Sequence, residues 1–505
     1  MGTVTSDRSD TPAGTGAPAR AGAPNGAGAP PLPDGLVVVV KRDCATCRLV
    51  VPVLAALAGG ERPLTVYTQD DPAFPEGLAS IDDTQLAVSY HHEIETVPTL
   101  IRVVDGAETG RIVGWNREEW RTFTGIADLG EELPVFRPGC GSLSVDPSLT
   151  DVLAVRFGRS VLRSRRVELA TLEDEFEALF ERGWTDGLPV VPPTEARVLR
   201  MLAGTTRAPD DVVAVVPPNL EPVTVEKVAV NAVMAGCKPE YLPVVLATIE
   251  AICNDEFNIH GLLATTMPVG PVIIVNGPIR RAIGMNSGVN VFGQGNRANM
   301  TIGRAVQLVV RNVGGGRPGE VDRATHGNPG KLSFCFPEDE EGSPWTPLHV
   351  ERGFDAGTST VTVFPGEGPR CVVDQQSRTP ESLCASLAAC LRTVHHPKLP
   401  LGFDAILVVG PDHARVFAQA GWTRERVLAE LHADLQLAGA DIVRGAGGIA
   451  EGVPTTMADA TLPKFRPGGI LLVHAGGGAG LFSAIIAGWA NGKTGSQPIT
   501  KEIRP

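Results

Sequence analysis

Two cysteines separated by two residues, Cys44 and Cys47, are the strongest candidates for reactive side chains in this sequence. They follow the apolar run 36–40 and lie at the start of a helix expected over 47–58. A thiol at the first turn of a helix has a lowered pKa, and a second thiol nearby can resolve a mixed disulfide. The spacing therefore predicts a redox-active dithiol that handles electrons or sulfur.

Zinc binding is the alternative for the same pair, because cysteine thiolates are also zinc ligands. A closed zinc site needs two further ligands, and the sequence contains no second CxxC motif. His91 and His92 are the nearby imidazoles, but adjacent residues rarely face the same point. We therefore favour the dithiol and predict no certain cofactor beyond Cys44 and Cys47.

Strands and helices alternate around this motif and predict a small domain over 35–127. The expected strands are 36–41, 64–68, 100–104 and 109–113, and the expected helices are 47–58, 82–89 and one from Arg117. Such alternation, closed by a hairpin, is typical of a mixed sheet with helices on both faces.

This domain resembles the thioredoxin family over about 90 residues. The likeness rests on Cys44-Ala45-Thr46-Cys47 after the first long strand, Val97-Pro98 about 50 residues later, and Gly114-Trp115 after the hairpin. The resemblance implies a thioredoxin-like fold in which Cys44 is the nucleophile, Cys47 resolves, and a cis Pro98 faces the disulfide and contacts substrate. It also implies an external thiol or a thioredoxin reductase system as partner.

A proline at that position exposes backbone groups to a bound peptide or thiol without adding a competing N–H. The sequence departs from the family at Asp43, where tryptophan is usual, and at Ala45-Thr46, where Gly-Pro is usual. A carboxylate beside a thiol raises its pKa, so Asp43 predicts a more reducing couple.

The composition of all 505 residues limits the classes of function. The formal net charge is −13, whereas a nucleic-acid-binding surface needs a basic face. No apolar run approaches the roughly 18 residues that a membrane span needs. We therefore expect a cytoplasmic enzyme that binds neither nucleic acid nor membrane, and the sequence does not indicate its oligomeric state.

The chain is long enough for two or three domains, and its predicted fold class is α/β. Residues 1–34 are rich in Gly, Ala and Pro and predict a disordered tail. Residues 128–166 are rich in Pro and Ser and predict a linker. The remainder predicts a large α/β domain in two lobes, 167–350 and 351–505.

Short apolar strands alternate with amphipathic helices throughout this large region. The expected strands are 212–216, 272–275, 360–364, 405–409 and 470–473. The expected helices are 172–182, 195–203, 225–235, 239–252, 297–313, 381–393, 414–420, 424–437 and 481–490. Turns at 276–278, 410–411 and 474–480 follow three of the strands, and in a parallel sheet such turns border one crevice, which predicts a shared cleft.

Asparagines and arginines gather around the first of these turns in a stretch with little other charge. They predict a pocket that orients a small polar substrate, although asparagine is also typical of helix caps and turns. The candidate substrate-binding residues are Asn276, Asn296, Arg297, Asn299 and Arg304.

Two further cysteines are candidates for a covalent sulfur intermediate. Cys237 lies between two expected helices beside Lys238, where a thiol would be activated, although lone cysteines are usually buried. Cys140 lies between glycines in the predicted linker and could carry a disulfide or persulfide between domains, or be an incidental loop cysteine. His260 and His326 are the best candidates for a general acid or base.

The large region also resembles bacterial UGSC-type (seleno)proteins, from about Leu172 to Pro505. The likeness lies in the stretches 183–193, 225–237 and 295–299 and in the final glycine-rich turn. The motif of that family is selenocysteine-Gly-Ser-Cys, and Cys140-Gly141-Ser142-Leu143 lacks its closing cysteine. The resemblance implies chalcogen redox chemistry.

These observations favour a thiol-dependent redox enzyme acting on a small polar molecule. In this hypothesis Cys237 or Cys140 forms a covalent sulfur intermediate, and the dithiol reduces it. Three alternatives remain open: a sulfurtransferase that uses a persulfide, a protein disulfide reductase with a substrate-binding module, and a metal-dependent lyase or hydrolase.

Overall fold

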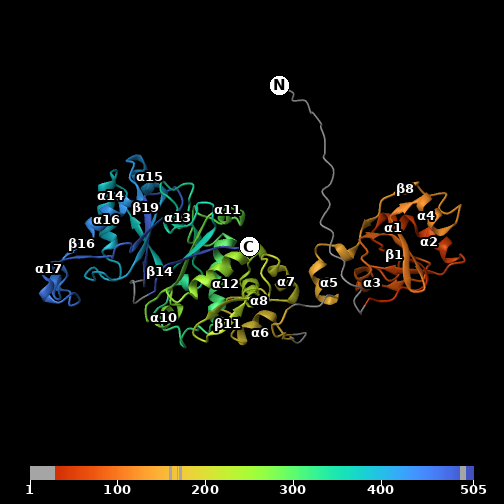
Figure 1. Cartoon of the computed structure of the whole chain (residues 1–505), viewed down its shortest axis with the longest axis horizontal. Coiled ribbons are helices and arrows are strands. Elements are labelled where there is room, and N and C mark those ends of the chain that lie inside the picture. The colour runs from red at the N-terminus through yellow and green to blue at the C-terminus, as the bar shows by residue number, and fades with distance from the viewer. Residues whose placement is uncertain (1–28, 158–161, 168, 170–172, 490–495) are drawn as a thin grey trace, which may run out of the picture. The chain divides into compact units, whose positions relative to one another are not determined.

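A computed structural model of the chain describes residues 29–157, 162–167, 169, 173–489 and 496–505. The fold is mixed α/β, and the chain divides into two compact units, Met1–Ser160 and Val161–Pro505 (Figure 1). Residues 1–28 of the predicted tail lie outside the described residues, whereas Leu32 is buried in the core of the first unit. No helix in the described parts of the chain is long and apolar enough to cross a membrane.

The first unit contains a five-stranded sheet in the order β3-β2-β1-β5-β6. β1 is parallel to β2 and antiparallel to β5. The strands are β1 (Gly35–Val40), β2 (Leu64–Thr68), β3 (Ile81–Asp82), β5 (Thr99–Val104) and β6 (Ala107–Val113). The helices are α1 (Ala45–Leu49), α2 (Val51–Ala58), α3 (Ala87–His91) and α4 (Arg117–Thr124).

β1 forms the centre of this sheet because its five apolar residues, 36–40, are buried on both faces. The expected strands are confirmed with small shifts at their ends. The helix expected over 82–89 differs, since β3 ends at Asp82 and the helix begins at Ala87.

Residues 128–166, expected as a linker, contain elements that pair with the first unit. β8 (Phe136–Arg137) pairs with β7 (Trp115–Asn116), and β9 (Cys140–Gly141) pairs with β4 (Thr96–Val97). The 3-10 turn η1 (Leu143–Val145) and α5 (Thr150–Phe157) follow. The first unit therefore extends well beyond the expected boundary at residue 127.

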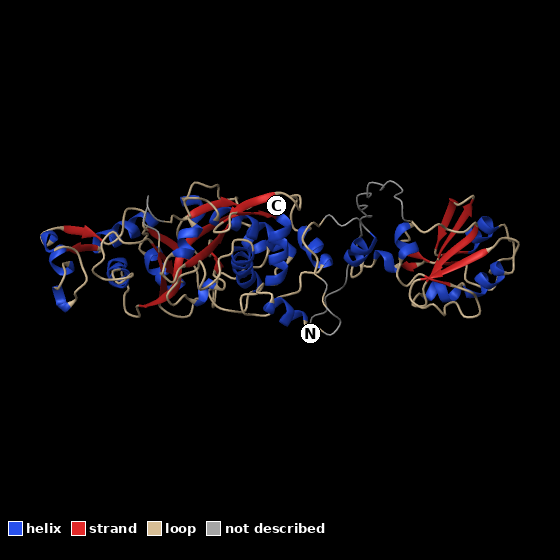
Figure 2. Ribbon diagram, turned by 90° about the horizontal axis from the view of Figure 1, so that it is seen from below, coloured by secondary structure: helices blue, strands red, loops and turns tan. Residues whose placement is uncertain are grey.

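The large unit contains a seven-stranded mixed sheet, and Figure 2 draws its strands in red. The strand order is β13-β12-β14-β19-β15-β18, with β20 paired to β14. Its strands are β12 (Gly270–Asn276), β13 (Cys335–Pro337), β14 (Thr360–Val373), β15 (Ala405–Val409), β18 (Ile470–His474), β19 (Phe482–Gly488) and β20 (Ile499–Glu502). The two predicted lobes thus contribute strands to one sheet.

The helix expected over 481–490 is wrong. Residues 482–488 form β19, which lies between β14 and β15 in the sheet. A short apolar run that is buried on both faces has no periodicity that distinguishes a strand from a helix. Here the run forms a strand because it pairs with β14 and β15.

Two sets of helices pack on the sheet and give it two cores (Figure 1). α8 (Val225–Ala235), α9 (Leu242–Ile252) and α12 (Arg297–Asn312) bury β12 residues such as Ile273. α14 (Pro380–Leu391), α15 (Pro411–Gln419) and α16 (Arg424–Asp434) bury β15 residues such as Leu407. Besides these two helix-covered cores, alternate residues of the same strands, including Ile274 and Val408, form a third.

The remaining elements flank this sheet. They are α6 (Glu175–Glu181), α7 (Glu195–Leu202), β10 (Val212–Val216), β11 (Glu221–Thr224), α10 (Ile259–Ala264), α11 (Ile279–Ala282), α13 (Leu348–Glu351), β16 (Gln436–Ala438), α17 (Gly439–Ile442) and β17 (Thr461–Pro463).

Candidate active site

Cys44 lies directly before α1, at the carboxyl end of the central strand β1. Its side chain caps the helix, because the backbone N–H of Cys47 donates to Cys44 Sγ at 3.3 Å. The Val97–Pro98 peptide bond is cis, as the sequence predicted, and Cys44 Sγ lies 3.5 Å from the carbonyl oxygen of Val97. Both thiols are covered, since Cys44 is 1% exposed and Cys47 is fully buried.

A third thiol, that of Cys140, joins this pair. β9 runs antiparallel to β4, with Val97 opposite Cys140. The Cys140 side chain, which is itself partly exposed, lies close enough to Cys44 to help lower the pKa of that thiol. The structure therefore places this cysteine in the dithiol site rather than on a free arm.

Side-chain hydrogen bonds hold the segment around Cys140 in place. The hydroxyl of Thr46 donates to Pro138 O at 2.6 Å, and Lys41 Nζ donates to Gly141 O at 2.8 Å. The buried Gln69 side chain donates to Ser142 Oγ at 2.6 Å and accepts from the N–H of Leu143. These contacts join residues far apart in the sequence, so no local pattern predicted them.

The thiols of the site differ in acidity. Hydrogen bonding from Cys47 lowers the pKa of Cys44 to about 5, with a further hydrogen bond from Cys140, although burial opposes the shift. Burial raises the pKa of Cys47 far above its usual range, and burial with the neighbouring Cys44 raises that of Cys140. The arrangement can therefore hold one thiolate, on Cys44, next to two protonated thiols.

The expectation that Asp43 raises the pKa of Cys44 is wrong. Asp43 is exposed, and its backbone N–H donates to the Asp70 carboxylate at 2.8 Å. Water screens an exposed carboxylate, whereas the hydrogen bonds to Cys44 act at contact distance in a covered site.

Cys237, the other candidate for a sulfur intermediate, lies in the core of the large unit. It is 6% exposed, and its Sγ donates to Thr301 O at 3.4 Å. Burial raises the pKa of Cys237 to about 12, more than Arg297 and Thr301 lower it. This thiol is therefore buried and protonated at neutral pH, and its surroundings do not favour attack on a substrate.

The asparagines and arginines of the predicted pocket make separate contacts within the protein. Asn296 caps α12, and Asn299 binds the loop carbonyls of Asn286 and Val291. Arg304 forms a bidentate ion pair with Asp186 at 2.7 Å.

Arg297 Nε donates to Gly236 O at 2.8 Å. The two candidate histidines, His260 and His326, are exposed. The structure thus brings Asn296 and Asn299 together in a cap, which was the alternative interpretation of the asparagines, and places Asn276 in a separate cluster.

That cluster, which we call the Glu338 cluster, lies where the carboxyl ends of β12, β13 and β18 meet. Asn276 Nδ2 donates to Glu338 Oε2 at 2.7 Å, and the N–H of Asp339 donates to His474 O at 2.8 Å. Its members are Asn276, Arg280, Glu338, Glu340, His349, Thr360 and Arg424. The sequence pointed to this junction through the turn after β12, but the acidic residues after β13 were missed.

Five buried polar atoms of the Glu338 cluster have no hydrogen-bond partner. They are Asn276 Oδ1, Glu338 Oε1, His349 Nδ1, Thr360 Oγ1 and Arg424 Nε. Burial raises the pKa of Glu338, against the N–H of Leu348 and the guanidinium of Arg424, whose Nη2 lies 3.8 Å from Glu338 Oε1. Buried polar groups are nearly always satisfied, so these atoms indicate a place for water or a small polar ligand.

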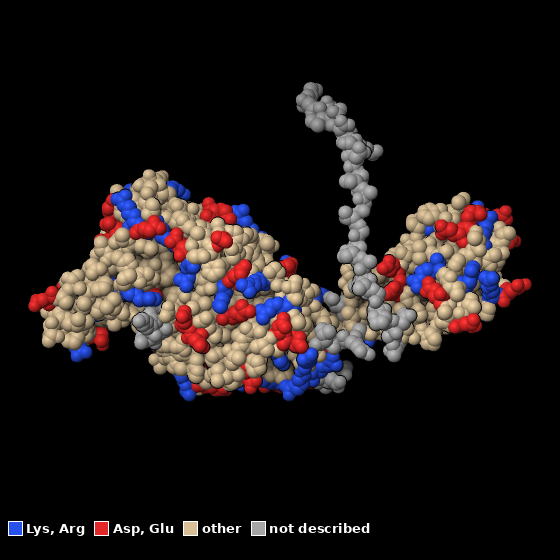
Figure 3. Space-filling view, in the orientation of Figure 1, with Lys and Arg blue, Asp and Glu red and all other residues tan. Residues whose placement is uncertain are grey.

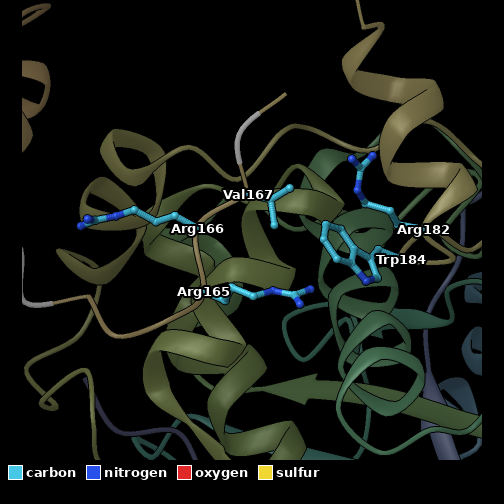
Figure 4. A pocket seen from close by; sticks show the side chains of 5 residues that line it. All are labelled: Arg165, Arg166, Val167, Arg182 and Trp184. Carbon is cyan, nitrogen blue, oxygen red and sulfur yellow. The ribbon is translucent and has the colours of Figure 1, made fainter. Parts of the chain in front are cut away.

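An open hollow of about 580 Å³ lies elsewhere in the large unit, lined by Arg165, Arg166, Val167, Arg182 and Trp184 (Figure 4). Arg165 lies over the Trp184 ring at 5.9 Å. Arg166 pairs with Glu195 and Arg182 with Glu173, in keeping with the mixture of acidic and basic side chains over much of the face drawn in Figure 3. These two ion pairs reduce the positive charge of the hollow.

Among the described residues, no group of three or more His, Cys, Asp or Glu side chains is arranged to hold a metal ion. Comparison with known proteins assigns the chain to no family, since no protein-family model matches it and no curated protein does.

Proposed function

We propose that this protein is a thiol-dependent redox enzyme in which the Cys44/Cys47 dithiol reduces a sulfur intermediate formed on Cys140. The single observation that carries the proposal is the pairing of β9 with β4, which sets Cys140 opposite Val97, the residue whose carbonyl oxygen lies 3.5 Å from Cys44 Sγ. Cys237 has no comparable thiolate neighbour in its described surroundings, and it is 6% exposed, whereas Cys140 is partly exposed.

The order of strands around β1 and the cis Pro98 beside Cys44 support the thioredoxin-like fold that the sequence resembles. They support the roles that the resemblance implies, with Cys44 as nucleophile and Cys47 as resolving thiol. Pro98 forms one wall of the site, and the carbonyl oxygen of Val97, which precedes it, lies beside Cys44 Sγ.

The reaction begins with a substrate disulfide, RS–SR. The sulfur of Cys140 attacks it, forms Cys140–S–S–R and releases one thiolate, which takes the proton that Cys140 gives up. The Cys44 thiolate then attacks Cys140 Sγ, forms a Cys44–Cys140 disulfide and releases the second thiolate.

The Cys47 sulfur finally attacks Cys44 Sγ, forms the Cys44–Cys47 disulfide and frees Cys140. The substrate has gained two electrons and the dithiol has lost two, with the proton of Cys47 passing to the second thiolate. An external dithiol resets the enzyme by reducing the Cys44–Cys47 disulfide.

Replacing Cys44 and Cys47 together by serine tests the proposal in the full-length chain. The double variant should lose multiple-turnover reduction of glutathione disulfide with dithiothreitol, measured above the uncatalysed rate. A Cys237→Ser variant is the control and should retain it. Full activity of the double variant would refute the proposal, and sulfur appearing in a product would favour sulfur transfer instead.

We also propose that the large unit binds a small polar molecule at the Glu338 cluster. Its five unpartnered atoms offer both hydrogen-bond donors and acceptors in one buried place. A high-resolution crystal structure should show density that bridges these atoms. Direct pairing of the five atoms with one another would remove this support.

A further inference from the structure

Beside the nucleophile lies a strand edge on which an extended peptide could pair, but another segment of the protein's own chain already pairs with it. Thr96 and Val97 form the short strand β4, whose Val97 carbonyl faces Cys44. Extended peptides bind to exposed strands by adding one more strand, which β9 already does here through the pairs Thr96↔Gly141 and Val97↔Cys140.

β9 is fixed to this edge by close backbone contact. A Cβ atom on Gly139 would lie 2.8 Å from Val97 O and closer still to the side chain of Thr96. Its carboxyl-terminal side is tied down as well, because the N–H of Ser142 donates to Glu95 O at 2.9 Å and its hydroxyl accepts from Gln69.

Access to the three thiols is correspondingly unequal. Cys44 is 1% exposed and Cys47 is fully buried, whereas Cys140 is partly exposed. Of these three thiols, a substrate that meets the protein in this conformation reaches only that of Cys140, and it must do so without displacing β9.

We infer that the site takes low-molecular-weight disulfides and excludes disulfides carried by extended peptides or proteins. This inference rests on the proposed function and gives its substrate class. β9 occupies the strand edge that a peptide substrate would use, and the partly exposed Cys140 gives a small disulfide a route to the covered dithiol.

The test compares glutathione disulfide with insulin, whose interchain disulfides are carried by peptide chains. Both are reduced with dithiothreitol, and the rate of the Cys44→Ser/Cys47→Ser variant is subtracted. The wild-type protein should reduce glutathione disulfide at least about tenfold faster than insulin at equal disulfide concentration.

Gly139→Ala should displace β9 and raise the insulin rate several-fold. Gly141→Ala, two positions further along and within β9, is the matched control, because a Cβ there meets no atom within 4 Å, and it should keep the wild-type preference. If Gly139→Ala does not fold, Thr46→Val takes its place by removing the hydroxyl that binds Pro138 O.

The outcomes separate the two claims. Equal rates of wild type on insulin and glutathione disulfide would overturn the inference and leave the proposed function standing. An unchanged preference in a folded Gly139→Ala or Thr46→Val variant would also overturn it. Wild-type rates no higher than those of the double serine variant on both substrates would instead refute the proposed function.

Discussion

The acidity of Cys44 depends on the hydrogen bonds that its sulfur accepts from neighbouring thiols and backbone N–H groups. A thiolate stabilised in this way favours the reduced protein and makes the Cys44–Cys47 disulfide a stronger oxidant. This is the reverse of the effect expected from Asp43, whose side chain is exposed. The sequence shows which residues neighbour a thiol along the chain, but not which donors the fold brings to it.

A pH titration of the reduced protein tests this acidity. Thiolate absorbance near 240 nm, corrected with the Cys44→Ser variant, should rise with a midpoint near pH 5, because hydrogen bonds hold the pKa of Cys44 at about 5. The folded pKa lies below the unfolded one, so the associated stability is present above the unfolded pKa and is lost as pH falls through 5. Cys140→Ala should raise the midpoint, and a wild-type midpoint above pH 8 would contradict the assignment.

A buried charge pair in the Glu338 cluster gives a second prediction at this scale. Glu338 is fully buried and Arg424 is 6% exposed, so Glu338→Gln leaves this buried cation with only the partly exposed carboxylate of Glu351, at 4.0 Å. We expect a loss of about 3–5 kcal/mol in the free energy of unfolding, measured by urea denaturation. Glu341→Gln, whose side chain is 44% exposed, is the control and should cost less than about 1 kcal/mol. Equal effects of the two substitutions would show that the pair is not buried.

At the scale of elements, the strands and helices that were predicted correctly are those whose formation depends on residues near one another in the sequence. The valines of β1 and the helices that begin at Arg117 and Val225 lie where the pattern places them. The pairing of β9 with β4 could not be predicted, because it joins Cys140 to Val97, 43 positions apart in the sequence, through backbone groups alone. The same holds for the site, of which the dithiol and Pro98 were found and the position of Cys140 was not.

β19, where a helix was expected, gives a prediction for an element. Ile486 is fully buried between β14 and β15, so Ile486→Ala should lower the free energy of unfolding by about 2–5 kcal/mol. Val373→Ala at the exposed end of β14 is the control, with an expected change within about 0.5 kcal/mol. Urea denaturation measures both, and a small loss at Ile486 would argue against a central strand here.

At the scale of the whole molecule, the large sheet is built from two similar halves. β12 is parallel to β13 and antiparallel to β14, and β15 is parallel to β18 and antiparallel to β19. In each half a Gly-Pro turn follows the first strand, at Gly277-Pro278 and at Gly410-Pro411. The sequence revealed the repeated turn, but the pairing of β14 with β19 that joins the halves depends on the complete fold.

Two units with separate cores predict two unfolding transitions. Oxidation to the Cys44–Cys47 disulfide should shift the transition of the first unit in scanning calorimetry and leave the other in place. Ile486→Ala identifies the transition of the large unit by lowering its midpoint. An equal shift of both transitions on oxidation would contradict a dithiol confined to the first unit.

The most direct test of the account is the disulfide that forms when the resolving thiol is absent. A reduced Cys47→Ser protein treated with one equivalent of glutathione disulfide, then mapped by peptide mass spectrometry without reduction, should contain a Cys44–Cys140 disulfide. Persistent glutathione on Cys44, with the Cys140 thiol still free, would contradict thiol–disulfide exchange between these two residues.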